Sequence, residues 1–270
     1  MSGQVMAFTR NELATVQVAG AIRDGDLVFV GVGTNGRAFT LAVGIPLVAV
    51  RLAQMTHAPA AAVYWGNLLE PDLSTIPDHL RQSSFTNWQG AASPADVGYK
   101  CDMLARGGFD VSFDSGAQID AHGNLNITAI GDYRRPRVRL VGCLAQPEHF
   151  AFVRRPIVMM DLDRRSFVEE VDFVTSVGHA RDGRTREEWG LGAGGPHLVV
   201  TDLAVFDFAS PDRRMRLRSL HPGATLEQVL DNMSFRPVMP HPVPQTPAPD
   251  ARQLDLIRRV IDPQRVLLKV

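Results

Sequence analysis

Apolar residues recur at helical spacing near the start of the chain. Thr9 and Glu12 have the spacing of a capping box, in which each side chain bonds the backbone N–H of the other residue. Asp24 and Gly25 are turn residues that end the segment. The pattern predicts a helix whose apolar face consists of Leu13, Val16, Ala19 and Ile22.

Apolar runs without polar alternation follow this helix. Residues 26–31 (DLVFVG) and 60–66 (AAAVYWG) are typical of strands that are covered on both faces. Between them, residues 45–55 (IPLVAVRLAQM) predict a helix that begins at Pro46, because proline is favoured in the first helical turn. This succession predicts an α/β fold with an open, mostly parallel sheet and flanking helices.

The remaining chain continues the α/β pattern. Residues 237–249 are rich in proline and predict an extended surface strap before a C-terminal helix near residues 252–261. Since the chain has no internal repeat and no clear linker, we expect one domain over residues 1–270. Further strands are predicted at residues 109–114, 156–161, 197–201 and 215–219, and a short helix at residues 225–232 with Thr225 as its N-cap.

Composition and charge narrow the classes of partner. The 270 residues are 45% hydrophobic, and the formal net charge of −1 comes from charges spread along the chain, so no basic stripe points to nucleic acid. The longest apolar stretch, residues 38–50, is short and is interrupted by Gly44 and Pro46, which argues against a membrane span. Cys101 and Cys143 form no Cys/His cluster. We expect a cytoplasmic protein without nucleic acid, membrane or metal partners.

A glycine-rich loop follows the first predicted strand. Gly31, Gly33 and Gly36 have the GxGxxG spacing of dinucleotide-binding loops. The acidic residue that binds the ribose is missing, because no Asp or Glu lies between Asp26 and Glu70. This argues against NAD and, less firmly, against NADP, whose 2′-phosphate would need an arginine. Candidate arginines are Arg37 and Arg51.

Two polar clusters have structural and functional interpretations. Residues 120–123 (DAHG) have the chemistry of a tight turn, near which Asn124, Asn126 and Asp132 are expected to bond backbone groups and hold a rigid surface. Glu169, Glu170 and Asp172 lie on a predicted strand and point to different faces, so we interpret them as solvated surface residues. The sequence contains no GxSxG, HxE or HExxH pattern.

The middle of the chain resembles a known family. Residues 116–142 (GAQIDAHGNLNITAIGDYRRPRVRLVG) resemble the signature segment of class I CoA-transferases, specifically the beta subunit of the glutaconate CoA-transferase type. The resemblance implies an acyl-CoA substrate, coenzyme A as part of that substrate with no separately bound cofactor, and an alpha-type partner subunit in a heterodimer or heterotetramer. It continues in order through residues 51–59, 164–179, 200–208, 220–235 and 261–268.

The family's catalytic glutamate has no counterpart in this chain. In the family, a glutamate that ends the second strand attacks the thioester, and CoA then passes through a glutamyl-CoA intermediate. Counting from Ala58 and Pro59, the family's Glu-Ser-Gly pattern falls on Gly66, Asn67 and Leu68. Glu70 would substitute only if the strand end were shifted, and a surface or ion-pair role is favoured for it.

Two further departures accompany the missing glutamate. Residues 31–44 replace a short Val-Gly turn of the family, and residues 143–147 (CLAQP) replace a glycine-rich loop. We expect backbone N–H groups near Gly33, Gly66 and Gly142 to stabilise a developing oxyanion. The residues expected to bind the substrate or its CoA are Gly31, Gly33, Asn35, Gly44, Asn67, Gly142 and Cys143.

These features support one main function and two alternatives. The main hypothesis is a beta-type subunit of a heteromeric enzyme that transfers CoA between carboxylic acids. Since Gly66 replaces the glutamate, the first alternative is an acyl-CoA hydrolase, a C–C bond-cleaving enzyme or a decarboxylase on the same scaffold. The second alternative is a catalytically silent subunit that binds CoA esters.

Overall fold

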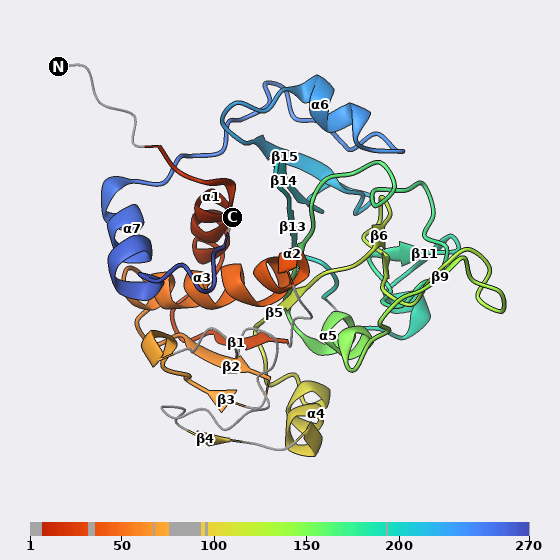
Figure 1. Cartoon of the computed structure of the whole chain (residues 1–270). Coiled ribbons are helices and arrows are strands. Elements are labelled where there is room, and N and C mark those ends of the chain that lie inside the picture. Colours follow the sequence, from red (N-terminus) through yellow and green to blue (C-terminus); the bar gives the residue numbers. More distant parts are fainter. Residues whose placement is uncertain are drawn as a thin grey trace. The chain divides into compact units, whose positions relative to one another are not determined.

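The chain forms two compact units. A computed structural model describes residues 7–31, 36–66, 68–75, 93–94, 97–192 and 194–269. Unit 1 contains Met1–Ala95 and Pro247–Val270, and unit 2 contains Asp96–Thr246 (Figure 1). Unit 1 is therefore assembled from both ends of the chain. Whether the two units act as the single domain expected over residues 1–270 stays a prediction.

Unit 1 combines parallel strands with helices. Strands β1 and β2 are parallel with Val30 opposite Trp65, and β3 returns antiparallel beside β2. Helix α3 packs against α1, β1, β2 and the C-terminal helix η5 (Figure 1). Its elements are α1 (Arg10–Ala19), β1 (Leu27–Val30), α2 (Gly36–Phe39), η1 (Thr40–Gly44), α3 (Ile45–Gln54), β2 (Ala62–Trp65), β3 (Leu68–Leu69), η2 (Leu73–Thr75), β4 (Ser93–Pro94), α7 (Ala251–Asp255) and η5 (Leu256–Ile261).

The predicted cap of the first helix is confirmed. The Thr9 hydroxyl accepts a hydrogen bond from the Glu12 backbone N–H at 3.1 Å, and the Glu12 carboxylate accepts one from the Thr9 N–H at 2.7 Å. Both contacts satisfy N–H groups that the first helical turn leaves without an intrahelical partner. A signal that spans four residues therefore marks where α1 begins.

The second helix begins earlier than the sequence predicts. Helical structure runs from Gly36 to Gln54, so residues 36–44 are not the enlarged loop that the pattern indicated. A π-helical segment precedes Pro46, in which the Ile45 N–H bonds the Thr40 carbonyl five residues back. This wider turn accommodates a proline, which lacks an N–H and crowds the preceding turn, inside a continuous helix.

The interruption expected at Gly44 and Pro46 is therefore wrong. The helix Gly36–Gln54 is long and apolar enough to cross a bilayer by length and composition, and 72% of its most apolar window is buried within the protein. Gly44 is fully buried, and a Cβ atom there would overlap the carbonyl oxygen of Leu267. The helix thus serves as the core of unit 1 and requires a glycine where the C-terminal segment crosses it.

Unit 2 is built on five strands ordered β15-β14-β13-β10-β5, of which β5, β10 and β13 pair in parallel and β14 runs antiparallel between β13 and β15. A buried cluster that includes Phe150, Phe167 and Phe206 fills its core. Its longer elements are α4 (Val97–Ala105), β5 (Val111–Asp114), α5 (Gln146–Phe152), β10 (Arg155–Met159), β13 (Leu198–Val200), β14 (Ala204–Asp207), β15 (Arg216–Leu220) and α6 (Leu226–Asp231). Short pairs are β6 (Gln118–Ile119) with β7 (Leu125–Asn126), β8 (Ala129–Ile130) with β9 (Val138–Arg139), and β11 (Ala180–Arg181) with β12 (Arg184–Thr185).

The pattern located most of these strands. The four strands predicted after residue 100 correspond to β5, β10, β13 and β15, and Thr225 caps α6 through its hydroxyl. The strand expected around Glu169 and Glu170 is wrong, because that segment is irregular beyond a single bridge at Phe167. Residues 237–249 contain no helix and run beside β15, where the Leu217 N–H bonds the Val238 carbonyl at 2.9 Å. Helices α7 and η5 occupy the region of the expected C-terminal helix.

Candidate functional site

The carboxyl ends of β1 and β2 form the predicted site of unit 1. Because Val30 is opposite Trp65, the next residues, Gly31 and Gly66, leave the parallel strands at the same edge. Open α/β sheets bind ligands at this edge. Gly66 is buried with φ of +59°, a left-handed conformation that favours glycine. The strand end to which the family resemblance assigns the glutamate therefore presents no side chain here.

Three predicted binding residues, Gly33, Asn35 and Asn67, lie outside the described residues. Gly31 is half-buried at the strand end, whereas Gly44 lies in the helix under the C-terminal segment. Interpreting Gly44 as a loop glycine is wrong, because its conformation and neighbours are those of a helix-packing residue. The part of the loop after Gly31 that the structure describes begins at Gly36, with φ of +56°.

Glu70 lies beside Val63, towards the start of β2. Its carboxylate accepts hydrogen bonds from the Val63 N–H at 2.6 Å and from the Gln54 amide at 3.2 Å, and its own N–H bonds the Val63 carbonyl. Gly66 lies three positions after Val63 along the chain, a distance of about 10 Å in an extended strand. Glu70 therefore supports the hairpin, and the strand end is not shifted to bring it to position 66. A catalytic role for Glu70 stays a prediction.

A hollow of about 350 Å³ adjoins Glu70. Arg51 lines it and donates to the Gln54 side chain at 3.1 Å. Arg37 donates to the Asn11 side chain at 2.6 Å. The two arginines that an NADP phosphate would require thus have protein partners, which weakens the nucleotide interpretation of the glycine-rich loop.

Gly142 and Cys143 lie in unit 2, where Gly142 is three residues beyond the end of β9. Gly142 has φ of +77°, and Cys143 is exposed. Partial burial raises the pKa of the Cys143 thiol, and the negative charge of Glu148 raises it further. The thiol is therefore protonated at neutral pH and lacks the activation of a cysteine nucleophile.

The oxyanion hypothesis needs a correction at two of its three glycines. The Gly66 N–H already donates to the Val30 carbonyl, and the Gly142 N–H donates to the Ile127 carbonyl, both at 2.9 Å. An N–H that is committed to a carbonyl in the fold does not point to a substrate oxygen. The sequence did not reveal this, because both acceptors belong to neighbouring strands or turns.

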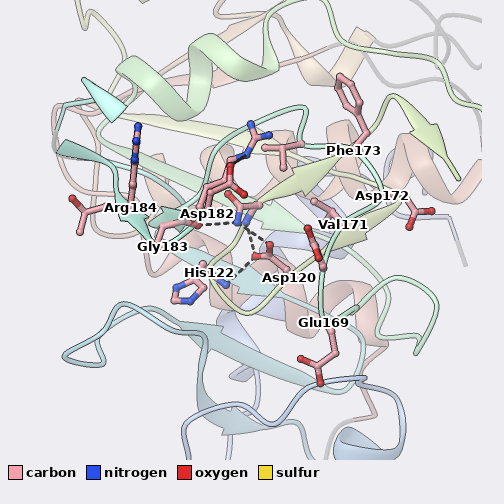
Figure 2. A pocket seen from close by; sticks show the side chains of 15 residues that line it. Asp120, His122, Glu169, Val171, Asp172, Phe173, Asp182, Gly183 and Arg184 are labelled. Atoms are coloured by element: carbon pink, nitrogen blue, oxygen red, sulfur yellow. Dashed lines mark hydrogen bonds and ion pairs between the residues drawn. The ribbon is translucent and has the colours of Figure 1, made fainter. Parts of the chain in front are cut away.

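The turn at residues 120–123 holds a network of polar contacts (Figure 2). The Asp120 carboxylate accepts from the backbone N–H groups of His122 and Asn124 at 2.9 and 3.0 Å, and from the Asn124 amide at 2.7 Å. Burial raises the pKa of Asp120 against the opposing effect of these bonds. Asn126 similarly accepts from the Thr128 N–H at 2.9 Å. The predicted rigid turn is confirmed.

This network borders a hollow of about 780 Å³ (Figure 2). Glu169 and Asp172 line it and are exposed, which confirms their interpretation as surface residues. Among the residues that the structure describes, no three His, Cys, Asp or Glu side chains gather in a way that would hold a metal ion. The hollow therefore lacks the donor set of a metal centre.

Sequence patterns missed two buried groups of unit 2. Arg186, 5% exposed, donates to the carbonyls of Phe150, Val177, Gly178 and Gly192 at 2.6 to 3.2 Å. His149 contacts the Asp114 carboxylate at 2.8 Å, and the Ser112 hydroxyl bonds the same carboxylate. Phe150 is 36 residues from Arg186, and Asp114 is 35 residues from His149, so no local spacing could have predicted these two contacts.

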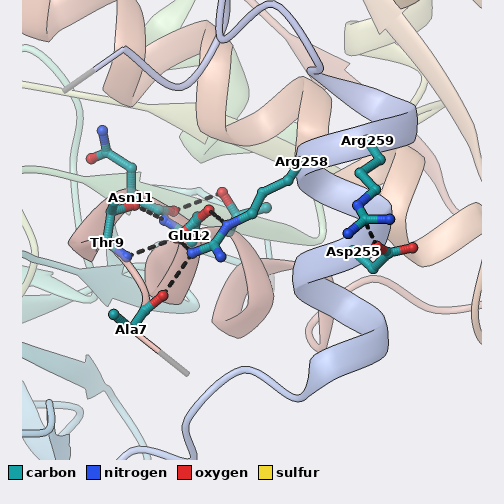
Figure 3. A network of polar contacts seen from close by, with 8 residues as sticks. Ala7, Thr9, Asn11, Glu12, Asp255, Arg258 and Arg259 are labelled. Atoms are coloured by element: carbon teal, nitrogen blue, oxygen red, sulfur yellow. Dashed lines mark hydrogen bonds and ion pairs between the residues drawn. The ribbon is translucent and has the colours of Figure 1, made fainter. Parts of the chain in front are cut away.

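Arg258 joins the two ends of the chain within unit 1 (Figure 3). Its guanidinium contacts the Glu12 carboxylate at 2.6 and 2.9 Å and the Ala7 carbonyl at 2.7 Å. Burial raises the pKa of Glu12, but the hydrogen bond from Arg258 and those at Thr9 outweigh it and lower that pKa overall. Asn11 adds a bond from its amide to the Lys269 carbonyl at 3.1 Å.

Comparison with known sequences identifies similar proteins. A sequence model of the coenzyme A transferase family matches residues 101–232. The chain is 30% identical to the B subunit of 3-oxoadipate CoA-transferase from Pseudomonas knackmussii over 93% of both chains. It is 31% identical to the B subunit of glutaconate CoA-transferase from Acidaminococcus fermentans over 97% of this chain and 96% of that one. It is also 31% identical to the cholesterol ring-cleaving hydrolase IpdB subunit of Rhodococcus jostii, over 82% and 83%.

Comparison with solved structures gives the same grouping. Glutaconate coenzyme A-transferase from Acidaminococcus fermentans superposes with a TM-score of 0.80 and 28% identity, over 97% of this chain and 98% of that one. The decarboxylase AibA/AibB superposes with a TM-score of 0.78 and 27% identity, over 96% of both chains. The similar proteins thus share one fold and carry out different reactions.

Proposed function

The chain belongs to the coenzyme A transferase family as a beta-type enzyme subunit, and from this premise we propose that it acts on an acyl-CoA thioester with a separately encoded alpha-type subunit. One observation carries the proposal. Over 93% or more of its length, this chain is similar to two proteins that are each the B subunit of a CoA-transferase. A chain of this kind implies a second, different chain.

The chemistry at Gly66 requires a carboxylate from elsewhere. In the family reaction a glutamate oxygen attacks the thioester carbonyl, CoA thiolate leaves, and the resulting anhydride is reopened by the thiolate to give glutamyl-CoA and the free acid. Glycine has no side chain that could form either intermediate. We propose that a carboxylate of the alpha-type subunit performs this step beside the strand end that Gly66 terminates.

A second candidate function is hydrolysis, C–C bond cleavage or decarboxylation of an acyl-CoA. Gly66 favours it, because these reactions proceed without a glutamyl-CoA on this chain. Similarity to the IpdB subunit of a ring-cleaving hydrolase and to the decarboxylase AibA/AibB also supports it. A subunit that only binds CoA esters is the third possibility, and it predicts binding without turnover.

The remaining properties follow from the same proposal. Coenzyme A enters as part of the substrate, with no separately bound cofactor. The complex is a heterodimer or a heterotetramer in the cytoplasm. The two cysteines, whose positions in the sequence indicate no disulfide framework, support this location.

The test is reconstitution with trapping. The full chain is co-expressed with the alpha-type subunit, and the purified complex is incubated with acetyl-CoA, succinyl-CoA or glutaryl-CoA, with and without an acceptor acid. Hydroxylamine or borohydride then traps any enzyme-bound acyl or CoA ester, and the modified peptide is mapped. We expect turnover, with label on the partner chain or no label at all.

Each product pattern decides between the candidates. A new CoA ester that needs the acceptor acid indicates transfer, whereas free CoA without an acceptor indicates hydrolysis, and released CO2 indicates decarboxylation. Binding without turnover of any thioester contradicts an active enzyme. Label on Glu70 contradicts a partner-supplied carboxylate, and Glu70→Gln is the matched variant, expected to retain full turnover.

A further inference from the structure

Exposed apolar side chains gather on one hairpin of unit 2. Among the residues that the structure describes, nine large apolar side chains are exposed, and four of them lie between residues 131 and 144, here called the hairpin surface. A cluster of this kind on a water-soluble surface marks an interaction site more often than isolated exposed residues do. The exposed fractions are 53% for Tyr133, 49% for Val138, 73% for Val141 and 65% for Leu144.

The hairpin surface is exposed on both faces. Strand β9 pairs antiparallel with β8, and the pairing continues as the Leu140 N–H bonds the Thr128 carbonyl at 3.0 Å. Side chains alternate along a strand, so Val138 and Arg139 point to opposite faces, and both are exposed. A two-stranded ribbon without a covering layer is marginally stable in water. Figure 1 shows this yellow-green hairpin at the outer margin of unit 2.

The hairpin is nevertheless ordered by its own contacts. The Asp132 carboxylate accepts from the backbone N–H groups of Arg134 and Arg135 at 2.8 and 3.1 Å. The Arg139 guanidinium lies 4.9 Å from the centre of the Tyr133 ring, which stacks on Phe173 at 5.0 Å. A surface that is already ordered loses little conformational entropy when a partner binds. Exposed Tyr and Arg side chains are also the types enriched where partners bind tightly.

The hairpin surface carries a net positive charge, which favours a negatively charged partner. Four arginines and one aspartate lie within residues 131–144, and all five are exposed. A second copy of this chain, placed symmetrically on the hairpin, would bring these arginines towards one another. A different chain with acidic groups around apolar pockets complements both the charge and the apolar side chains. The arginines are Arg134, Arg135, Arg137 and Arg139.

We propose that the hairpin surface is the docking site of the alpha-type subunit, which meets it with an acidic, partly apolar face. The inference rests on the proposed function, because that function supplies the second chain. Gly142 and Cys143, which are expected to bind the substrate, begin three residues after the end of β9 and lie within the hairpin surface. Docking at the hairpin surface therefore brings the partner next to a segment that is expected to bind the substrate.

The test replaces the exposed apolar anchors. The double variant Val141→Asp/Leu144→Asp of the full chain is co-expressed with the alpha-type subunit, and the affinity of the two chains is measured by calorimetry or native mass spectrometry. Because both side chains are more than 60% exposed, the variant chain keeps the wild-type circular dichroism spectrum and melting temperature. We expect the dissociation constant to rise about a hundredfold or more.

A matched control carries the same chemical change elsewhere. Val260→Asp/Met239→Asp replaces two other exposed apolar residues, 48% and 40% exposed, and is expected to bind the partner with wild-type affinity. A charge variant, Arg135→Glu/Arg137→Glu, is expected to weaken binding about tenfold at low salt and to flatten its salt dependence.

The outcomes separate the two proposals. If the wild-type chain binds no alpha-type subunit, the proposed function fails, and the docking proposal fails with it. If the wild-type complex forms and Val141→Asp/Leu144→Asp binds as tightly as the control, only the docking proposal is overturned. Self-association of the wild-type chain that the same variant abolishes also overturns it, because a second copy would then occupy the hairpin surface.

Discussion

The turn at residues 120–123 and the strand end at Gly66 look equally promising as sites, but they are organised in opposite ways. In the turn, the Asp120 carboxylate is committed to backbone N–H groups around it. At the strand end the position has no side chain, and the Gly66 N–H is committed to the Val30 carbonyl. The polar cluster around Asp120 thus holds a turn together. Gly66, where a reactive group was expected, offers neither a side chain nor a free backbone N–H.

The carboxylates of Asp120 and Glu70 differ in burial but are bonded in a similar way. Asp120 is buried, and burial raises its pKa, whereas Glu70 is half-buried in the β2–β3 hairpin. Both accept hydrogen bonds from main-chain N–H groups. A carboxylate bonded in this way stabilises a turn or hairpin and is a poor candidate for a nucleophile, whatever its sequence position suggests.

The largest effect is expected from the loss of the Arg186 side chain, whose hydrogen bonds connect several segments of unit 2. Arg186→Met removes the donor of four carbonyl groups, two of which belong to the buried residues Phe150 and Gly178, so we expect the free energy of unfolding to fall by about 4 kcal/mol. Urea denaturation of the full chain measures this loss. Arg154→Met, at a 73% exposed side chain, is the control and should change it by less than about 0.5 kcal/mol. Equal effects of both variants would contradict a structural role for Arg186.

His179, also in unit 2, is expected to make the stability of the fold depend on pH. Burial lowers the pKa of His179 from 6.5 to about 4, opposed by the hydrogen bond to the Pro196 carbonyl. Between these values the unfolded chain binds a proton that the folded chain does not, so stability is present above pH 6.5 and is lost as the pH falls towards 4. The loss attributable to His179 is about 3 kcal/mol. Unfolding of wild type and His179→Gln at about pH 7 and about pH 4.5 measures it, and parallel losses in both would contradict the assignment.

A smaller effect is expected at the strand region of unit 1. Glu70→Ala removes the acceptor of the Val63 N–H and of the Gln54 amide, which lowers the free energy of unfolding by about 1 to 2 kcal/mol. Turnover per folded complex should not change, since this carboxylate is assigned to structure. Glu169→Ala, at an exposed carboxylate, serves as the control. A fall in kcat for the folded Glu70 variant would restore Glu70 as a catalytic residue.

The smallest effect concerns the backbone at the strand end. Gly66→Ala places a Cβ atom on a residue with φ of +59°, and we expect a loss of about 1 kcal/mol in thermal or urea unfolding. Gly192→Ala is the matched control, because a Cβ atom there meets nothing within 4 Å and its φ is not in the left-handed region. A neutral Gly66→Ala variant would show that the position tolerates a side chain.

Local signals predicted local structure well. The caps at Thr9 and Thr225 and the turn closed by Asp120 each depend on residues within four positions of one another, and all three are observed. The start of the helix at Gly36 was missed. A proline such as Pro46 occurs in the first turn of a helix, but it also occurs inside a helix when a π-helical turn precedes it, as it does here. Only packing against the C-terminal segment distinguishes the two.

The candidate site was predictable to a lesser extent. Family resemblance pointed to the strand end at Gly66, and the structure places a buried glycine there. The bond that commits the Gly66 N–H joins residues 36 positions apart, and the contacts of Arg186 with Phe150 join residues of separate elements. Such contacts depend on strand register and tertiary packing, which no short motif encodes.

Unit 1 combines segments that are synthesised far apart in time. Met1–Ala95 leave the ribosome first, but their helices close against Pro247–Val270, where Arg258 contacts Glu12 and Leu267 crosses Gly44. Domains ordinarily fold as they emerge, from the N-terminus onwards. Here the first segment does not complete its packing, and the side of the apolar helix Gly36–Gln54 that contacts η5 stays open, until Pro247–Val270 have been made. A stop codon placed after residue 246 would release a chain whose later unit is finished and whose earlier one is not.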